Sequence, residues 1–121
     1  MRVFHVTTAG EWQDARHTGS YRRSTRGASL DEVGFIHLSD ADQLPRVADF
    51  LYRDSRDPLV VLELESDEVL AAGAELRWED GGAGEDFPHL YGPIELAWVH
   101  TVWPAGFGAD GAFVWPLPDD R

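Results

Sequence analysis

The amino-acid sequence predicts an α+β domain with a mainly antiparallel or split β-sheet. Strand patterns and helix patterns alternate in the first half of the chain, whereas the second half holds mostly strand patterns. The helical segments are too few for a doubly wound parallel sheet, which needs helices between its strands. We therefore expect a single domain over residues 1–121, with two or three short helices beside the sheet.

Each element of the first half is marked by its periodicity and by the residues at its ends. Alternation of apolar and polar residues indicates the strands, while capping residues and glycines indicate the helix boundaries. The expected elements are a strand at 2–7, a helix at 9–17, an Arg-rich loop at 20–28, a single helical turn at 29–32 and a strand at 34–39.

The second half opens with a helix and continues mainly as strands. Apolar residues at positions 44, 47, 48 and 51 predict a helix to about residue 52, and the apolar run at 59–64 predicts a central strand. The remaining expected elements are a short helix or turn at 66–73, strands at 76–79, 96–103 and 112–115, a Gly-rich acidic loop at 81–86, a rigid turn at 87–93 bracketed by two prolines, and a loop at 104–111.

The composition describes an acidic protein with ample material for a core. Hydrophobic residues make up 43% of the chain, so we expect a folded domain. Acidic residues outnumber basic ones 22 to 10, for a formal net charge of −12, which disfavours nucleic-acid binding. The chain has no cysteine and no apolar run long enough to cross a membrane. We expect a soluble, cytoplasmic protein, and the sequence leaves its oligomeric state open.

Three histidines lie in settings that are unusual for histidine. His5 and His37 lie within strands, and each is followed two residues later, on the same face, by a hydroxyl side chain, Thr7 or Ser39. His89 lies in the turn bracketed by prolines. A histidine that faces the interior needs partners for its ring nitrogens, so it is either bonded to a neighbour or open to a ligand. The repeated pairing of histidine and hydroxyl favours a shared polar pocket.

Further residues are candidates for the same pocket. Tyr21 is the one large side chain of the Arg-rich loop, and Tyr91 alternates with His89 in the rigid turn. Glu79 and Glu95 are carboxylates that can reach a pocket, and the simpler interpretation of each is a solvated surface group. For Tyr91 the simpler interpretation is a structural corner whose ring packs and whose hydroxyl caps backbone.

Residue spacing argues against several other classes of site. A zinc site built from His5, His37 and His89 would require three distant segments to converge, because no HxxH, HxH or HExxH spacing occurs. We keep zinc as a minor alternative and predict no metal. Ser39 is not expected to be a nucleophile, because no G-x-S-x-G motif is present. Phosphate-loop and Rossmann glycine patterns are also missing.

Three segments, taken in this order, resemble a small bacterial family known as domain of unknown function 952. The segments are His5-Val6-Thr7 followed by Trp12, then Gly34-Phe35-Ile36-His37-Leu38-Ser39 with Gln43, and Phe87-Pro88-His89-Leu90-Tyr91-Gly92-Pro93. The resemblance runs from about Val3 to Trp103 and so covers nearly the whole chain.

The resemblance implies an ADP-ribosyltransferase-like fold and an NAD site, because the family is grouped by fold with that superfamily. The first half is also similar to RNA 2′-phosphotransferases, in which a His-x-Thr strand and a later V-H-L-S strand line the NAD pocket. By this analogy His5 and His37 contact the nicotinamide ribose or the phosphates, and Ser39 hydrogen-bonds the ligand. Glu79 is then the candidate for stabilising an oxocarbenium-like state.

The resemblance leaves two functions open. The first is an enzyme that binds NAD or a related nucleotide and transfers or hydrolyses its ADP-ribose, with Glu79 and His37 as catalytic residues. The second is a binding module that recognises a small nucleotide-like ligand or a partner without turnover. The predicted ligand-binding residues are His5, Thr7, Tyr21, Ser39, His89 and Tyr91.

Two departures from the phosphotransferase pattern restrict these functions. The acidic chain lacks an N-terminal basic lobe for holding RNA, so RNA is not expected as a substrate. An arginine that would hold the ligand phosphates is not identifiable, unless the cluster of Arg22, Arg23 and Arg26 supplies it.

Overall fold

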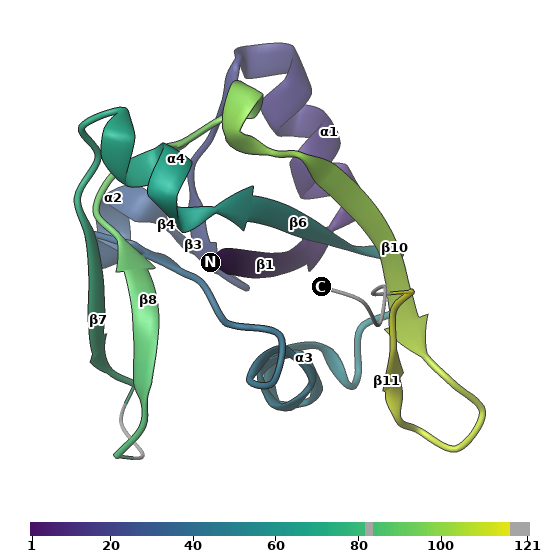
Figure 1. Cartoon of the computed structure of the whole chain (residues 1–121). Helices are drawn as coiled ribbons and strands as arrows, with labels where there is room; N and C mark the ends of the chain where they lie inside the picture. The colour runs from purple at the N-terminus through teal and green to yellow at the C-terminus, as the bar shows by residue number, and fades with distance from the viewer. Residues whose placement is uncertain (82–83, 117–121) are drawn as a thin grey trace.

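A four-stranded antiparallel sheet lies at the centre of the molecule, with the strand order β1-β6-β10-β11 (Figure 1). The computed structural model describes residues 1–81 and 84–116 of the chain. The strands of the central sheet are β1 (Arg2–Thr8), β6 (Leu59–Glu65), β10 (Thr101–Phe107) and β11 (Phe113–Val114). Because β6 pairs with β1 on one side and with β10 on the other, the prediction of a central strand at 59–64 is confirmed.

Four α-helices occur in the described residues, where the sequence indicated two or three. They are α1 (Ala9–Thr18), α2 (Leu30–Val33), α3 (Leu44–Tyr52) and α4 (Ser66–Ala71), and a 3-10 turn covers Leu96–Trp98. The expected caps form. Thr8 accepts a hydrogen bond from the Glu11 N–H at the start of α1, and Gly19 ends that helix in the left-handed conformation. None of the helices within 1–81 and 84–116 is long and apolar enough to cross a membrane.

Strand β1 is buried on both faces because a helix covers each face of the sheet. On one face Val3 packs with Leu62 of β6 and with Ala15 of α1. On the other face Phe4 and other apolar residues of the sheet pack with Ala48 of α3. The period of two along a strand sends alternate residues into these two clusters. The sheet therefore lies between α1 and α3, as Figure 1 shows.

A second antiparallel sheet stands beside the first. Its strand order is β5-β8-β7, formed by β5 (Ile36–His37), β8 (Asp86–Leu90) and β7 (Leu76–Asp80). The two sheets meet where Phe4 and Ser39 exchange backbone hydrogen bonds of 2.7 and 2.8 Å. The mixed architecture with a mainly antiparallel sheet is thus confirmed, and its β-structure is divided into a central sheet and this smaller one.

The segment at 20–28, expected to be a loop, contains three short strands instead. They are β2 (Ser20–Tyr21), β3 (Arg23–Thr25) and β4 (Ala28–Ser29). β3 and β4 form a small hairpin, and β2 pairs with β9 (Ile94–Glu95), which lies far along the chain. The polar sequence has no strand period, and pairing with a distant segment supplies the order that local residues do not predict.

The expected rigid turn at 87–93 is wrong, because most of it belongs to β8. Pro88 lies within that strand although proline cannot donate to a sheet. Its carbonyl accepts a hydrogen bond from the Leu38 N–H, so the side of Pro88 that lacks a donor faces the chain just beyond the end of β5 and leaves the pairing with β7 intact. The chain turns only afterwards, at Tyr91 and Gly92.

The last long strand is displaced from its expected position. The segment predicted as a strand at 96–103 begins with the 3-10 turn, and β10 starts at Thr101. The strand then runs through Pro104, which pairs with Val60 of β6, into residues expected to form a loop. The edge strand expected at 112–115 is confirmed as β11.

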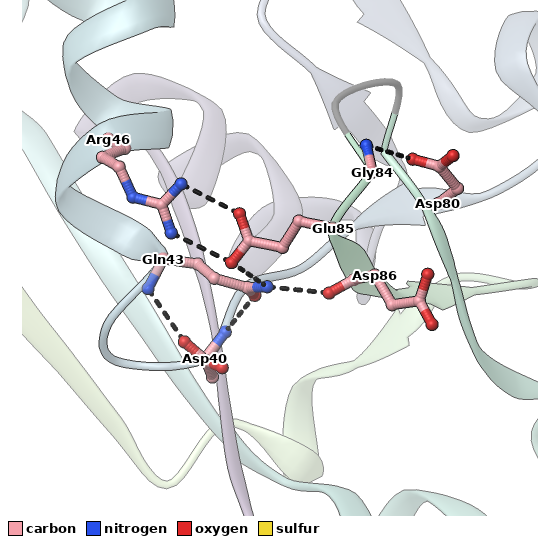
Figure 2. Close-up of polar contacts among 7 residues, drawn as sticks. All are labelled: Asp40, Gln43, Arg46, Asp80, Gly84, Glu85 and Asp86. Atoms are coloured by element: carbon pink, nitrogen blue, oxygen red, sulfur yellow. Dashed lines mark hydrogen bonds and ion pairs between the residues drawn. The ribbon is translucent and has the colours of Figure 1, made fainter.

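Polar contacts join the start of β8 to the start of α3 (Figure 2). We call this set of contacts, made by Asp40, Gln43, Arg46, Glu85 and Asp86, the clasp. The Gln43 side chain, which is buried, donates from Nε2 to the Asp86 carbonyl at 2.7 Å and to Glu85 at 3.2 Å. Gln43 and Asp40 also bond reciprocally, side chain to backbone N–H. Arg46 holds both oxygens of the same Glu85. The expected Gly-rich loop at 81–86 partly falls on residues 82–83, outside the described residues.

We expect the clasp to depend mainly on Gln43. In Gln43→Ala the Asp40 N–H and the Asp86 carbonyl lose their partner inside the fold, so the free energy of unfolding should fall by about 1–3 kcal/mol. Arg46→Ala removes an exposed ion pair from the same place and should cost clearly less. Urea unfolding of both variants measures the difference, and an equal loss in the two would contradict the buried amide as the main contact.

Candidate functional site

One face of the β5-β8-β7 sheet carries polar and aromatic side chains. His37 pairs with His89, and His89 pairs with Arg77, so these three side chains project from the same face. Glu79 follows Arg77 by two residues and shares that face. The opposite face packs into the core through Ile36 and its neighbours. The strand register therefore gathers residues from three segments of the chain.

We call this cluster the histidine face. It consists of Phe35, His37, Arg77, Glu79, His89 and Tyr91.

His89 is at the centre of the histidine face. Its side chain is buried, and its Nδ1 lies 2.9 Å from Oε1 of Glu79. Its Nε2 is also buried, yet it has no hydrogen-bond partner among the described residues. Buried polar atoms nearly always have a partner, so such an atom calls for an explanation.

Glu79 receives a second contact on the same oxygen. The Tyr91 hydroxyl donates to Oε1 of Glu79 at 2.5 Å, so Oε2 lies outside both contacts. The hydrogen bonds from Tyr91 and His89 hold the pKa of Glu79 below its usual value. The same bond raises the pKa of Tyr91 above its usual value. Glu79 is thus a carboxylate that is ionised at neutral pH and oriented by two neighbours.

Aromatic rings cover His89. Phe35 stacks on the His89 ring with centroids 4.1 Å apart and an interplanar angle of 19°. The His37 ring meets it edge-on at 5.1 Å. Phe35 also contacts Tyr91, and the Arg77 guanidinium lies over the Tyr91 ring, 5.2 Å from its centroid. These rings form an apolar frame around an ionisable pair.

His37 is half-buried, and its ring lies against Phe35 and His89. In the described part of the chain its ring nitrogens have no hydrogen-bond partner. Burial, and the nearby His89, lower the pKa of His37 from its ordinary value. A neutral imidazole at this position can exchange a proton with, or hydrogen-bond, a group that approaches from solvent.

His5 belongs to a different environment from the His37 ring. Its Nδ1 lies 2.6 Å from the His37 carbonyl oxygen, and its Nε2 lies 2.7 Å from the Tyr21 hydroxyl. A carbonyl only accepts, so Nδ1 carries the proton and Nε2 accepts from Tyr21. Burial lowers the pKa of His5 to about 4. Both nitrogens are therefore satisfied inside the protein, and the expected shared pocket of His5 and His37 does not form.

The remaining predicted residues are buried near this network. Burial raises the pKa of Tyr21, and a hydrogen bond from Thr7 opposes that shift. Burial also raises the pKa of Tyr52 of α3, and a hydrogen bond from Thr7 again opposes that shift. Ser39 is buried where the two sheets meet, and its backbone pairs with Phe4. His5, Thr7, Tyr21 and Ser39 thus form or adjoin the core behind the histidine face, and their ligand-binding roles remain predictions.

The three arginines proposed as a phosphate anchor have acidic partners elsewhere. Arg22 pairs with Asp31, Arg23 with Glu11 and Arg26 with Asp54. Arg77, by contrast, lies on the histidine face and pairs with the exposed Glu75. Arg77 and Phe35 belong to the site although neither was predicted from the sequence as a member of it. Phe35 could have been found from its period with His37, whereas Arg77 is placed only by pairing with β8.

Two open depressions lie away from the histidine face. One, of about 730 Å³, is lined by Met1, Arg2, Phe4, Asp40, Ala41, Asp42 and Glu65. The other, of about 420 Å³, lies along β10 and β11 and is mostly apolar. The described residues contain no group of three or more histidine, cysteine or acidic side chains suited to a metal ion.

The fold and the histidine face together define a small mixed α/β protein with a carboxylate-oriented histidine on one surface of its antiparallel sheet. The chain belongs to the family described as protein of unknown function (DUF952), whose profile matches residues 6–102. The match includes β5 and β8, which carry two of the segments on which the resemblance rests, and it begins at Val6, within β1 and just after His5.

Solved structures of one relative share this fold. The crystal structure of protein CC0527 from Caulobacter crescentus has a TM-score of 0.80 and 29% sequence identity, and the similarity covers 94% of each chain. A crystal structure of a double mutant of CC0527 gives the same values. The solution NMR structure of CC0527 has a TM-score of 0.73 and covers 92% of this chain and 90% of that chain. Comparison with curated proteins gave no match.

Proposed function

We propose that this protein binds a small nucleotide-like ligand, with NAD as the first candidate, at the histidine face. The observation that carries the proposal is the buried Nε2 of His89, which lacks a hydrogen-bond partner among the described residues. Beside it are the half-buried His37 ring and the ionised Glu79. A polar atom without a partner, beside an ionised carboxylate and a neutral imidazole, is more typical of a binding site than of a structural corner.

Several features of the histidine face suit the parts of such a ligand. Phe35 and Tyr91 offer aromatic surface to a planar base. Arg77, on the same face, is the candidate to meet a phosphate in place of Arg22, Arg23 and Arg26. The division of the β-structure where Phe4 meets Ser39 supports the proposal that the fold is ADP-ribosyltransferase-like.

For turnover we propose Glu79 as the group that stabilises positive charge on the ribose. Cleavage of the glycosidic bond of NAD passes through an oxocarbenium-like state, which an oriented carboxylate stabilises. Oε2 of Glu79 lies outside the contacts to His89 and Tyr91, so it is the oxygen for this role. In hydrolysis, water would add to the ribose carbon as nicotinamide leaves, and His37 would take the proton that the water releases.

A binding module without turnover is the second candidate function. It is favoured by the position of His5 and Thr7, which match the His-x-Thr strand of the phosphotransferase pattern and which here lie in the core with Tyr21 as a bonded neighbour. Under this function Glu79 serves to orient His89 for binding alone.

Thermal-shift titration with NAD, ADP-ribose, nicotinamide and a set of nucleotides tests the proposal. At one hundred times its dissociation constant a ligand stabilises the folded state by about 2.7 kcal/mol, which is several degrees for a domain of this size. We expect NAD to raise the melting temperature of the wild type, and His37→Ala to fold normally while losing most of this shift.

His17→Ala is the matched control, because His17 is an exposed histidine at the end of α1, away from the sheet. It should keep the full shift. If NAD and the nucleotides all leave the melting temperature unchanged, the proposed ligand class is wrong. If NAD binds without release of nicotinamide over hours, the binding module is the function.

A further inference from the structure

The hydrogen bonds around Glu79 determine which nitrogen of His89 carries a proton. An ionised carboxylate can only accept hydrogen bonds, and Oε1 of Glu79 lies 2.9 Å from Nδ1 of His89. Nδ1 must therefore be the protonated nitrogen that donates to Glu79. In the neutral ring Nε2 is then left with a lone pair and no proton. This is the same Nε2 that is buried and lacks a partner in the described residues.

We infer that Nε2 of His89 is a hydrogen-bond acceptor that selects ligands carrying a neutral or cationic donor group, such as a carboxamide N–H or a hydroxyl O–H. The inference rests on the proposed function, because it names the chemical class that the histidine face recognises. A carboxamide on an aromatic ring, as in nicotinamide, and a ribose hydroxyl are two sources of the same donor chemistry.

The surroundings of Nε2 disfavour an anion. The negative charge of Glu79 lies on the other side of the same ring, and the His37 ring that faces His89 has a lowered pKa and is neutral at pH 7. A carboxylate placed at Nε2 would meet a lone pair and the nearby negative charge of Glu79, and the His89 ring offers no donor at that atom. Nicotinamide should therefore be preferred over nicotinate, which differs only in the group that would meet Nε2.

Access to Nε2 requires movement of a ring. Phe35 stacks on His89, and His37 meets it edge-on. Both rings are half-buried, so each exposes part of its surface to solvent. A ligand ring that takes the place of Phe35 or His37 would restore the lost aromatic contact and bring its donor to Nε2.

Glu79→Gln is the decisive variant because it keeps the shape of the side chain and changes the proton pattern. The amide of glutamine can donate to Nδ1 of His89, which lets the neutral ring carry its proton on Nε2. We expect the wild type to bind nicotinamide and NAD about tenfold more tightly than nicotinate and deamidated NAD, the loss typical of one unmatched hydrogen bond. In Glu79→Gln this preference should disappear or reverse.

Glu75→Gln is the matched control. Glu75 is an exposed carboxylate beside Arg77, and its replacement removes the same charge without a contact to His89. It should keep the tenfold preference. A second set of ligands tests a hydroxyl as the donor. It compares adenosine and ribose with ribose 5-phosphate.

Each outcome has one meaning. A preference for the amide that Glu79→Gln loses and Glu75→Gln keeps supports the acceptor. Equal affinity for amide and acid, or equal effects of the two variants, overturns it, while NAD binding itself leaves the proposed function standing. If no member of the panel binds, the proposed function fails. In that case the ¹⁵N chemical shifts of the His89 ring in the free protein test the inference separately. A neutral ring with its proton on Nε2 overturns the inference, and a neutral ring with a lone pair on Nε2 supports it.

Discussion

Replacing His5 with alanine is expected to lower the free energy of unfolding by about 3 kcal/mol, because it removes a buried side chain together with its two hydrogen bonds and leaves the His37 carbonyl without this donor. His5 is 4% exposed, and its two nitrogens bond the His37 carbonyl and the Tyr21 hydroxyl. The lost contacts join β1 to β5 and β2, so the effect extends over three strands.

Chemical unfolding with urea measures this loss. Tyr21→Phe is the smaller companion change, since it removes only the hydroxyl and leaves Nε2 of His5 unpaired, at a cost of about 1–2 kcal/mol. His17→Ala, on the surface, should be neutral. A His5→Ala protein of wild-type stability that no longer responds to NAD would contradict the structural role and restore His5 as a ligand contact.

Acidification is expected to destabilise the protein well above the range in which carboxylates titrate. The pKa of His5 is lowered to about 4 in the folded state, mainly by burial, against an ordinary value of about 6.5 when the chain is unfolded. Between these values the unfolded state binds more protons than the folded state. The neutral ring therefore contributes stability that is complete above about pH 6.5 and is lost as the pH falls towards about 4.

From linkage, His5 alone should remove about 2 kcal/mol of stability between pH 7 and pH 5, and about 3 kcal/mol below pH 4. The pKa of His37 is lowered too, so it adds to the loss in the same direction. Glu79 and Glu85 have lowered pKa values and lose their contributions only in more acidic solution. Urea midpoints at pH 7, 6 and 5 thus report the histidines.

His5→Asn is the comparison for this experiment. The asparagine side chain does not titrate, so the stability of this variant should be lower than that of the wild type at pH 7 and should fall less steeply down to pH 5. A wild-type midpoint that stays constant between pH 7 and pH 5 would show that His5 is protonated without cost, which is incompatible with the buried network.

Local signals in the sequence located most of the helices and long strands. Thr8 with Glu11, and Ser29 with Glu32, predicted two helix starts, because a cap is a contact between residues three apart. The apolar run of β6 indicated its central place because only a strand buried on both faces needs that composition. The segments around Pro88 and Pro104 were predicted as a turn and a loop, but both belong to strands. Whether a strand tolerates a proline depends on which neighbour the missing N–H would face, and the sequence does not show this.

The members of the candidate site were predicted one at a time. Each was chosen for its own position in the sequence: His37, Glu79, His89 and Tyr91. That the four lie on one face of a sheet was not predictable, because this depends on the register of β5, β8 and β7. Arg77 entered the histidine face through the same register. The sequence allowed His5 to be either a core residue bonded to a neighbour or a ligand contact. The structure shows the first, because the Tyr21 hydroxyl bonds Nε2 of His5.

The sequence by itself determined the mixed α/β class, the central strand, the capped helices and the membership of a family through its His-rich segments, because these follow from short-range periodicity and residue identity. Only the tertiary structure decided that Nδ1 of His89 meets Glu79, that its Nε2 is left without a partner, and that His5 lies behind the site. Hydrogen bonding between residues on different strands depends on distances and directions that exist only once the strands have paired.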